Sequence, residues 1–106
     1  MNLAISKEIN KEYVEAIELY EQELKKNENP SVDIYLNLGF LYWTIAYDWI
    51  FNTEYHIPDE LSNRGGENFR SIFEQGLVHY PRNIELHFWK KYCSSMLLDE
   101  VFRKKD

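Results

Sequence analysis

The sequence predicts an all-α domain, and three observations carry this prediction. Apolar side chains recur every three or four residues along most of the chain, which is the spacing of one face of a helix. Polar stretches that contain proline or glycine separate these periodic segments. No segment shows the alternation of apolar and polar residues that is typical of a strand. We therefore expect four main antiparallel helices in a single domain over residues 1–106.

The first two helices are expected at about residues 8–27 and 32–51. In the first, an apolar stripe and an acidic outer face make the helix amphipathic. It should end before Pro30, because proline disfavours helical geometry in the residue before it. Ser31 is a suitable N-cap for the second helix, and Asp33 in its first turn suits the helix dipole.

A long connection between the second and third helices is expected at residues 52–66, because Pro58 and two adjacent glycines stand there among polar side chains. A loop of this length in a small domain is often functional. The third helix is expected at about residues 67–79, and Pro81 follows its end.

The last helix is expected at about residues 84–103, with Asn83 as its N-cap. Leu86, Trp89 and Cys93 share its apolar side, so Cys93 is expected to be a buried, inert thiol. Because it is the single cysteine, it cannot form an intrachain disulfide. The N-terminal segment also lacks the cationic and apolar pattern of a secretory signal, so a cytoplasmic location is expected.

Charge is distributed unevenly along the chain, whose formal net charge is −6. Residues 1–62 hold 12 acidic and 4 basic side chains, net −8, whereas residues 63–106 hold 6 and 8, net +2. A negative field attracts cationic proteins and repels phosphate backbones, so we expect a basic protein partner and no nucleic acid. The longest apolar run, residues 38–51, is shorter than the roughly 18 residues of a membrane span, so no membrane association is expected.

Residues 35–42, YLNLGFLY, resemble the first helix of a tetratricopeptide repeat: an aromatic residue is followed by leucine, glycine and tyrosine at offsets of three, four and seven. Residues 13–24 are similar to the second helix of that repeat. The resemblance covers residues 11–51 closely and residues 67–97 loosely. It implies helix-turn-helix pairs. Because glycine is costly inside a helix, Gly39 predicts a close helix approach, and we expect Ala16 to be its small partner.

In this family, ligands usually lie in a groove lined by the first helix of each pair. The resemblance therefore implies that a partner contacts seven residues of the second expected helix: Asp33, Leu36, Asn37, Phe40, Trp43, Thr44 and Tyr47. The aromatic members of this set are equally compatible with an ordinary core. Polar residues interleaved with aromatic ones favour a groove, since they are costly in a dry core unless they are paired.

Two further sets of residues are candidates for partner contact. Five residues form the acidic face of the first expected helix and would dock a basic surface: Glu8, Glu12, Glu15, Glu18 and Glu21. The alternative is an ordinary solvated face. The long connection contributes Tyr55, His56 and Asp59, although such loops equally often cover the core.

No catalytic constellation is present in the sequence. His56, His79 and His87 are not spaced as paired metal ligands, and no motif supplies both a reactive group and its activator. We therefore expect a non-enzymatic protein-protein interaction module that uses no metal or cofactor. By analogy from size and charge, its most concrete form is an immunity or antitoxin-type protein that neutralises a basic toxin domain. The alternatives are a chaperone or adaptor that binds an extended peptide and, from another class, a small enzyme or ligand-binding bundle that uses His56 or His79.

Overall fold

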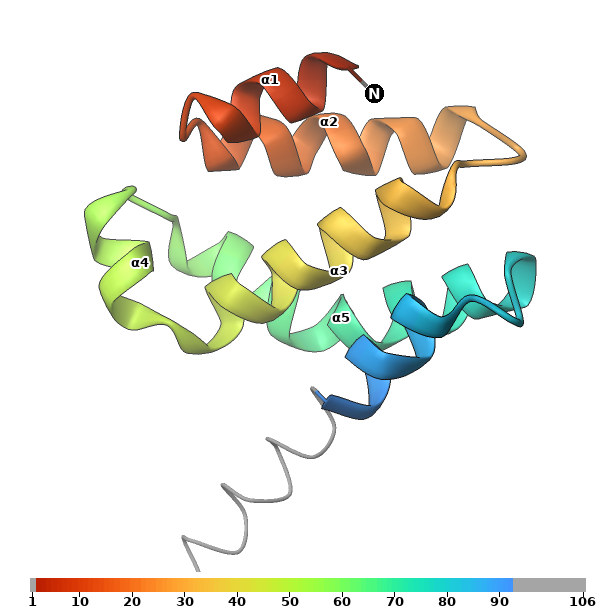
Figure 1. Cartoon of the computed structure of the whole chain (residues 1–106). Coiled ribbons are helices and arrows are strands. Elements are labelled where there is room, and N and C mark those ends of the chain that lie inside the picture. The colour runs from red at the N-terminus through yellow and green to blue at the C-terminus, as the bar shows by residue number, and fades with distance from the viewer. Residues whose placement is uncertain (1, 93–106) are drawn as a thin grey trace, which may run out of the picture.

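Six helical segments build the part of the chain that the computed structural model describes, residues 2–92 (Figure 1). No strand occurs among these residues, so the predicted all-α class is confirmed. The segments are α1 (Asn2–Ile9), α2 (Tyr13–Lys26), α3 (Val32–Tyr47), α4 (Trp49–Glu54), α5 (Asp59–His79) and a further helical stretch at residues 84–92. The rest of the helix expected at 84–103, with Cys93, lies outside the described residues.

The prediction of a single helix at residues 8–27 is wrong, because two helices, α1 and α2, occupy this region. Lys11 adopts the left-handed conformation with φ 63°, and two backbone hydrogen bonds close the end of α1 around it. The amide of Glu12 donates to the carbonyl of Lys7 at 2.8 Å, and the amide of Lys11 donates to the carbonyl of Glu8 at 3.0 Å. This is the Schellman arrangement, in which glycine is the usual residue. With a lysine there, the sequence contains no helix-stop signal.

The helix expected at residues 32–51 is divided at Asp48. The Asp48 carboxylate accepts a hydrogen bond from the amide of Phe51 at 3.0 Å and so caps α4. Aspartate side chains compete in this way with the continuing helix, since they offer the backbone another partner. The short helix α4 is held against α2 by an aromatic cluster of Tyr13, Phe51 and Tyr55, whose ring centroids lie 4.7–4.8 Å apart.

The long connection predicted at residues 52–66 is also wrong. Helices α4 and α5 occupy most of it, and only residues 55–58 connect them. Pro58 is the N-cap of α5 with φ −63°, and both glycines of the predicted loop lie inside α5. Gly65 is buried against α3, where an added Cβ atom would lie 2.7 Å from the carbonyl oxygen of Tyr42. The glycine is therefore needed for a close helix approach rather than for a turn.

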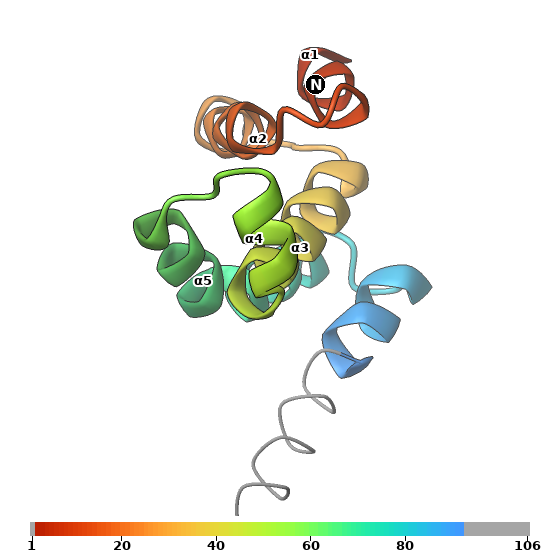
Figure 2. The same cartoon turned by 90° about the vertical axis from the view of Figure 1, so that its left-hand side faces the viewer.

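Helix α3 is the centre of the packing, with α5 on one side and α2 on another (Figures 1 and 2). Gly39 does permit a close approach, but its partner is Phe73 of α5, whose ring atom Cε1 would lie 2.5 Å from an added Cβ. The prediction that Ala16 faces Gly39 therefore names the wrong partner. Ala16, on α2, is completely buried in the core.

The helical stretch at residues 84–92 is attached to this core by Leu86, which is completely buried. Its side chain reaches Gly76 of α5, where an added Cβ would lie 3.1 Å from Leu86 Cδ1. The predicted N-cap is confirmed, since the side-chain oxygen of Asn83 accepts from the amide of Leu86 at 2.9 Å. This anchoring brings the stretch beside α3, where its aromatic residues meet those of the central helix.

Candidate functional site

A group of aromatic side chains from α3 and residues 84–92 remains partly exposed, and we call it the aromatic face. Its members are Phe40, Trp43, Tyr47, Phe88, Trp89 and Tyr92. Exposed fractions of 41% for Phe40, 40% for Tyr47 and 57% for Phe88 place these rings at the surface. The alternative that Phe40 and Tyr47 are ordinary core residues is therefore wrong. Trp43 and Trp89 are half-buried and pack against the core.

Ring contacts between the two segments fix the aromatic face. Phe40 meets Trp89 with centroids 5.4 Å apart, and Trp43 meets Tyr92 at 5.9 Å, both in edge-to-face geometry. Tyr47 continues the chain of contacts to Phe69 of α5 at 6.1 Å. Edge-to-face pairs at these distances are favourable beyond the area they bury. A partner would therefore meet a preorganised apolar surface.

A hollow of about 570 Å³ lies beside the aromatic face, and we call it the aromatic hollow. Its walls are aromatic apart from two polar residues: Phe40, Trp43, Thr44, Tyr47, Asp48, Trp49 and Phe51. The Thr44 hydroxyl donates to the carbonyl of Phe40 at 2.9 Å, and Asp48 caps α4. Both polar groups therefore have partners within the protein, which leaves a predominantly apolar concavity.

The structure brings together only part of the groove expected on α3. Phe40, Trp43, Thr44 and Tyr47 share the aromatic hollow, whereas Asp33, Leu36 and Asn37 do not line it. The Asn37 side chain donates instead to the hydroxyl of Tyr20 at 3.2 Å, and so faces α2. Leu36 packs against the core, and Asp33 is exposed in the first turn of α3.

The five glutamates of the expected acidic face do not form one continuous helix surface. Glu8 lies on α1 and accepts a hydrogen bond from the Tyr20 hydroxyl at 2.8 Å. Glu12, in the link before α2, and Glu15 lie 3.0 Å and 2.9 Å from Lys7 Nζ. Hydrogen bonds from Lys7 to Glu15 and then to Glu12 raise the pKa of this lysine.

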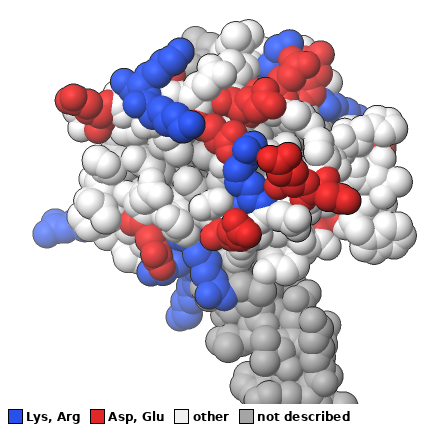
Figure 3. Space-filling view, turned by 180° about the vertical axis from the view of Figure 1, so that it is seen from behind, with Lys and Arg blue, Asp and Glu red and all other residues white. Residues whose placement is uncertain are grey.

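Glu21 makes contacts with α3 and α5. It accepts from the Tyr42 hydroxyl and from Arg64 Nη2, the latter at 3.2 Å. Arg64 Nε is buried without a hydrogen bond of its own, but it lies at an ion-pair distance of 3.1 Å from Glu21. Of the five glutamates, all within the described chain, only Glu18 has no such contact. Figure 3 shows acidic and basic side chains next to one another on the face that it presents.

Two buried tyrosine hydroxyls belong to these polar contacts. The pKa of Tyr20 lies far above its ordinary value, mainly because the hydroxyl is buried and secondly because it donates a hydrogen bond to Glu8. Burial and the hydrogen bond to Glu21 raise the pKa of Tyr42 in the same way. Each phenol is held in its neutral form, where it can donate to a carboxylate. These contacts link α1, α2, α3 and α5, which indicates a structural role.

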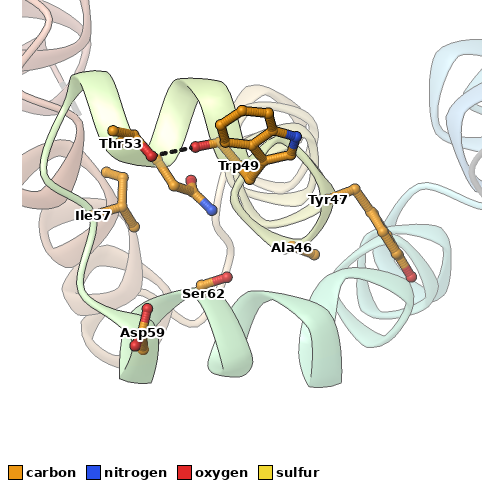
Figure 4. Close-up of a pocket in the computed structure, with 8 residues that line it drawn as sticks. Ala46, Tyr47, Trp49, Thr53, Ile57, Asp59 and Ser62 are labelled. Carbon is orange, nitrogen blue, oxygen red and sulfur yellow. Dashed lines mark hydrogen bonds between the residues drawn. The ribbon is translucent and has the colours of Figure 1, made fainter.

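The residues expected in a long loop occupy three different environments. Tyr55 is half-buried in the aromatic cluster with Tyr13 and Phe51. His56 is exposed and left-handed with φ 52°, at the end of α4. Asp59 begins α5 and lines a second hollow of about 370 Å³ between α4 and α5 (Figure 4). We call this second hollow the polar hollow.

Trp49 is the functional candidate that sequence reasoning missed. Its side chain is 73% exposed and lines both hollows, as does Tyr47. The helical period through residue 51 predicts that Trp49 lies on a continuous helix, but the break at Asp48 turns it outward. The sequence predicts Trp89 on the apolar side of the last helix and does not single out Tyr92, and the contacts of both residues with α3 become visible only in the tertiary structure.

Within residues 2–92, no group of three or more His, Cys, Asp or Glu side chains is placed to hold a metal ion. His79 stacks on Tyr35 at 5.9 Å, and a ring nitrogen of His87 lies 2.7 Å from the carbonyl oxygen of Pro81. No helix in this part of the chain is long and apolar enough to cross a membrane. Protein-family models, curated proteins and solved structures were each compared with the chain, and none matches it significantly.

Proposed function

We propose that this chain is a non-enzymatic protein-binding module that holds a segment of a partner protein on the aromatic face and in the hollow beside it. The observation that carries this proposal is the exposure of aromatic rings that are already locked by one another. Isolated exposed apolar residues are normal, but a contiguous aromatic patch beside a concavity is typical of an interaction site. Large aromatic anchors of this kind dominate binding energy when a partner covers them.

We further propose a tetratricopeptide-like arrangement, in which α4 is an insertion between the two helices of a pair. The support is the order of packing along the chain: α1 against α2, α2 against α3, and α3 against α5. In such an arrangement, α3 and residues 84–92 would be successive groove-lining helices. The aromatic contacts between these two segments favour this assignment.

A second candidate is an immunity-type protein that neutralises a basic toxin domain. It is favoured by the net charge of −6 and by residues 27–63, which contain six acidic residues and no lysine or arginine. Such a field would steer a cationic partner toward α3 and α4. The five glutamates near α1 and α2 favour this candidate less, because four of them are paired within the protein.

Partner capture from a lysate of the source organism, followed by mass spectrometry, tests the proposal with matched variants. Phe40→Ala and Trp43→Ala should each reduce recovery of the captured protein at least tenfold, because each removes an anchor from the aromatic face. Glu18→Lys changes an exposed residue of α2 and should leave recovery within about twofold. Circular dichroism checks that each variant is folded.

The opposite pattern would overturn the groove proposal. If Glu18→Lys abolishes capture while both aromatic variants retain it, the acidic surface binds the partner. If all variants capture the same protein equally, neither surface does.

A further inference from the structure

The aromatic hollow and the polar hollow are neighbours that share a wall. Tyr47 and Trp49 line both of them, so an apolar space and a polar one adjoin at these two residues. Figure 4 shows the polar hollow between α4 and the first turns of α5, with Trp49 and Asp59 on opposite sides of it. A bound segment that passes from one hollow to the other would present neighbouring side chains to two different environments.

The polar hollow presents hydrogen-bond acceptors. The hydroxyl of Thr53 donates to the carbonyl of Trp49 at 2.8 Å, and the hydroxyl of Ser62 donates to the carbonyl of Ile45 at 2.5 Å. Because a hydroxyl has one hydrogen and two lone pairs, both oxygens keep only acceptor capacity. One amide hydrogen of Asn52 Nδ2 is donated to the carbonyl of Ile45 at 2.8 Å, while Asn52 Oδ1 is buried with no partner in the described structure.

Charge around the polar hollow has one sign. Asp59 is the one charged residue among the described residues of its wall. The positive end of the α5 dipole amounts to about half a charge, which the full charge of the Asp59 carboxylate exceeds. The unpartnered Asn52 oxygen adds negative potential at the wall. Trp49 supplies an aromatic face that a cation can cover.

The polar hollow is large enough for a long side chain. Its volume is about 370 Å³, near the small end of the roughly 300–1,000 Å³ found for ligand sites. A guanidinium or ammonium group on an extended aliphatic stem would place its charge near Asp59 and its stem along the ring of Trp49. An anionic or purely apolar side chain would leave the acceptor groups unpaired, which is costly.

We propose that the polar hollow binds an arginine or lysine side chain of the partner protein, next to an apolar side chain that fills the aromatic hollow. This inference rests on the proposed function and specifies its partner: a protein segment with a basic residue beside an apolar one. The negative charge of Asp59 attracts a cationic side chain. The Thr53 and Ser62 hydroxyl hydrogens are already bonded to backbone carbonyls, so they would not bind an acidic side chain. Both features would select this segment over neutral or acidic ones.

Titration of two synthetic peptides, followed by nuclear magnetic resonance of the Trp49 indole N–H, tests this inference. Both are capped seven-residue peptides of leucine and serine, with arginine at the centre of one and citrulline, its uncharged isostere, in the other. The arginine peptide should shift the Trp49 signal and bind at least tenfold more tightly. Asp59→Asn should bring this preference to within about twofold, whereas Asp33→Asn, the same change at an exposed site outside the hollow, should preserve it.

Equal affinity for the two peptides, no binding of the arginine peptide at millimolar concentration, or an unchanged preference in Asp59→Asn would each overturn the inference. These outcomes are separate from the failure of the proposed function. If Trp43→Ala loses the captured partner but the peptides bind equally, the aromatic face is a binding site without a cation pocket. If both aromatic variants retain the partner while Asp59 sets the peptide preference, the pocket exists but the proposed docking face is wrong.

Discussion

Two adjacent glycines of α5 provide a sensitive test of the packing between α5 and α3. Alanine gains about 1 kcal/mol over glycine inside a helix, and both positions should receive this gain. At Gly66 an added Cβ would have its nearest neighbour, Ala46 Cβ, at an ordinary 3.7 Å. At Gly65 the added Cβ would lie 2.7 Å from the carbonyl oxygen of Tyr42, a backbone atom that moves only if α3 moves. Overpacking of this kind costs about 1–3 kcal/mol.

We therefore expect Gly66→Ala to stabilise the protein by about 0.5–1 kcal/mol, whereas in Gly65→Ala the overpacking cost offsets this gain and leaves a net destabilisation of about 0–2 kcal/mol. Urea unfolding followed by circular dichroism at 222 nm measures both changes. In a domain of this size, 1 kcal/mol corresponds to a shift of about 4–8 °C in Tm, so thermal unfolding should separate the variants clearly. Equal stability of the two variants would refute the close approach, because a solvated loop at residues 52–66 would treat both glycines alike.

Two further predictions concern the helix break and the buried phenols. Asp48→Ala should lower the free energy of unfolding by about 0.5–2 kcal/mol because α4 loses its cap. Asp48→Asn should retain most of the stability, since asparagine also caps helices, and urea unfolding measures both variants. An equal loss of stability in both would exclude the cap. Stability should fall as pH rises above about 10, because unfolded tyrosine ionises there while Tyr20 and Tyr42, with raised pKa values, keep their protons in the folded state. Urea unfolding at pH 8 to 11 measures the fall, which Tyr42→Phe should reduce; an identical pH profile in this variant would exclude Tyr42 as a contributor.

The candidate site could be predicted in part from the sequence. The helical period of α3 places Phe40, Trp43, Thr44 and Tyr47 on one side, and the structure gathers these four at one hollow. Asn37 shares that helical face by spacing, but the Tyr20 hydroxyl provides a partner on α2 that no local pattern reveals. The second wall of the aromatic face comes from residues 84–92, about fifty residues along the chain, so its position depends on tertiary packing.

The acidic residues show why charge in sequence differs from charge at a surface. Counting along the chain predicts that Glu15 and Glu21 belong to one uncompensated face. In the folded protein Glu15 meets Lys7 of the preceding helix, and Glu21 meets Arg64 of α5, 43 residues away in sequence. Only the fold decides which charges are left for a partner, because ion pairing over several ångströms depends on distances between separate helices.

The sequence by itself determined the class of the fold and the chemistry of its helices. Apolar spacing of three and four residues requires buried helix faces, and a local signal such as the Asn83 cap acts within one turn. The tertiary structure decided where two helices end and what two glycines are for. Lys11 and His56 adopt left-handed geometry without the glycine that usually marks it, and Gly65 lies inside a helix because α3 passes against it. Such choices depend on contacts between distant segments, whose energies outweigh the intrinsic preferences of single residues.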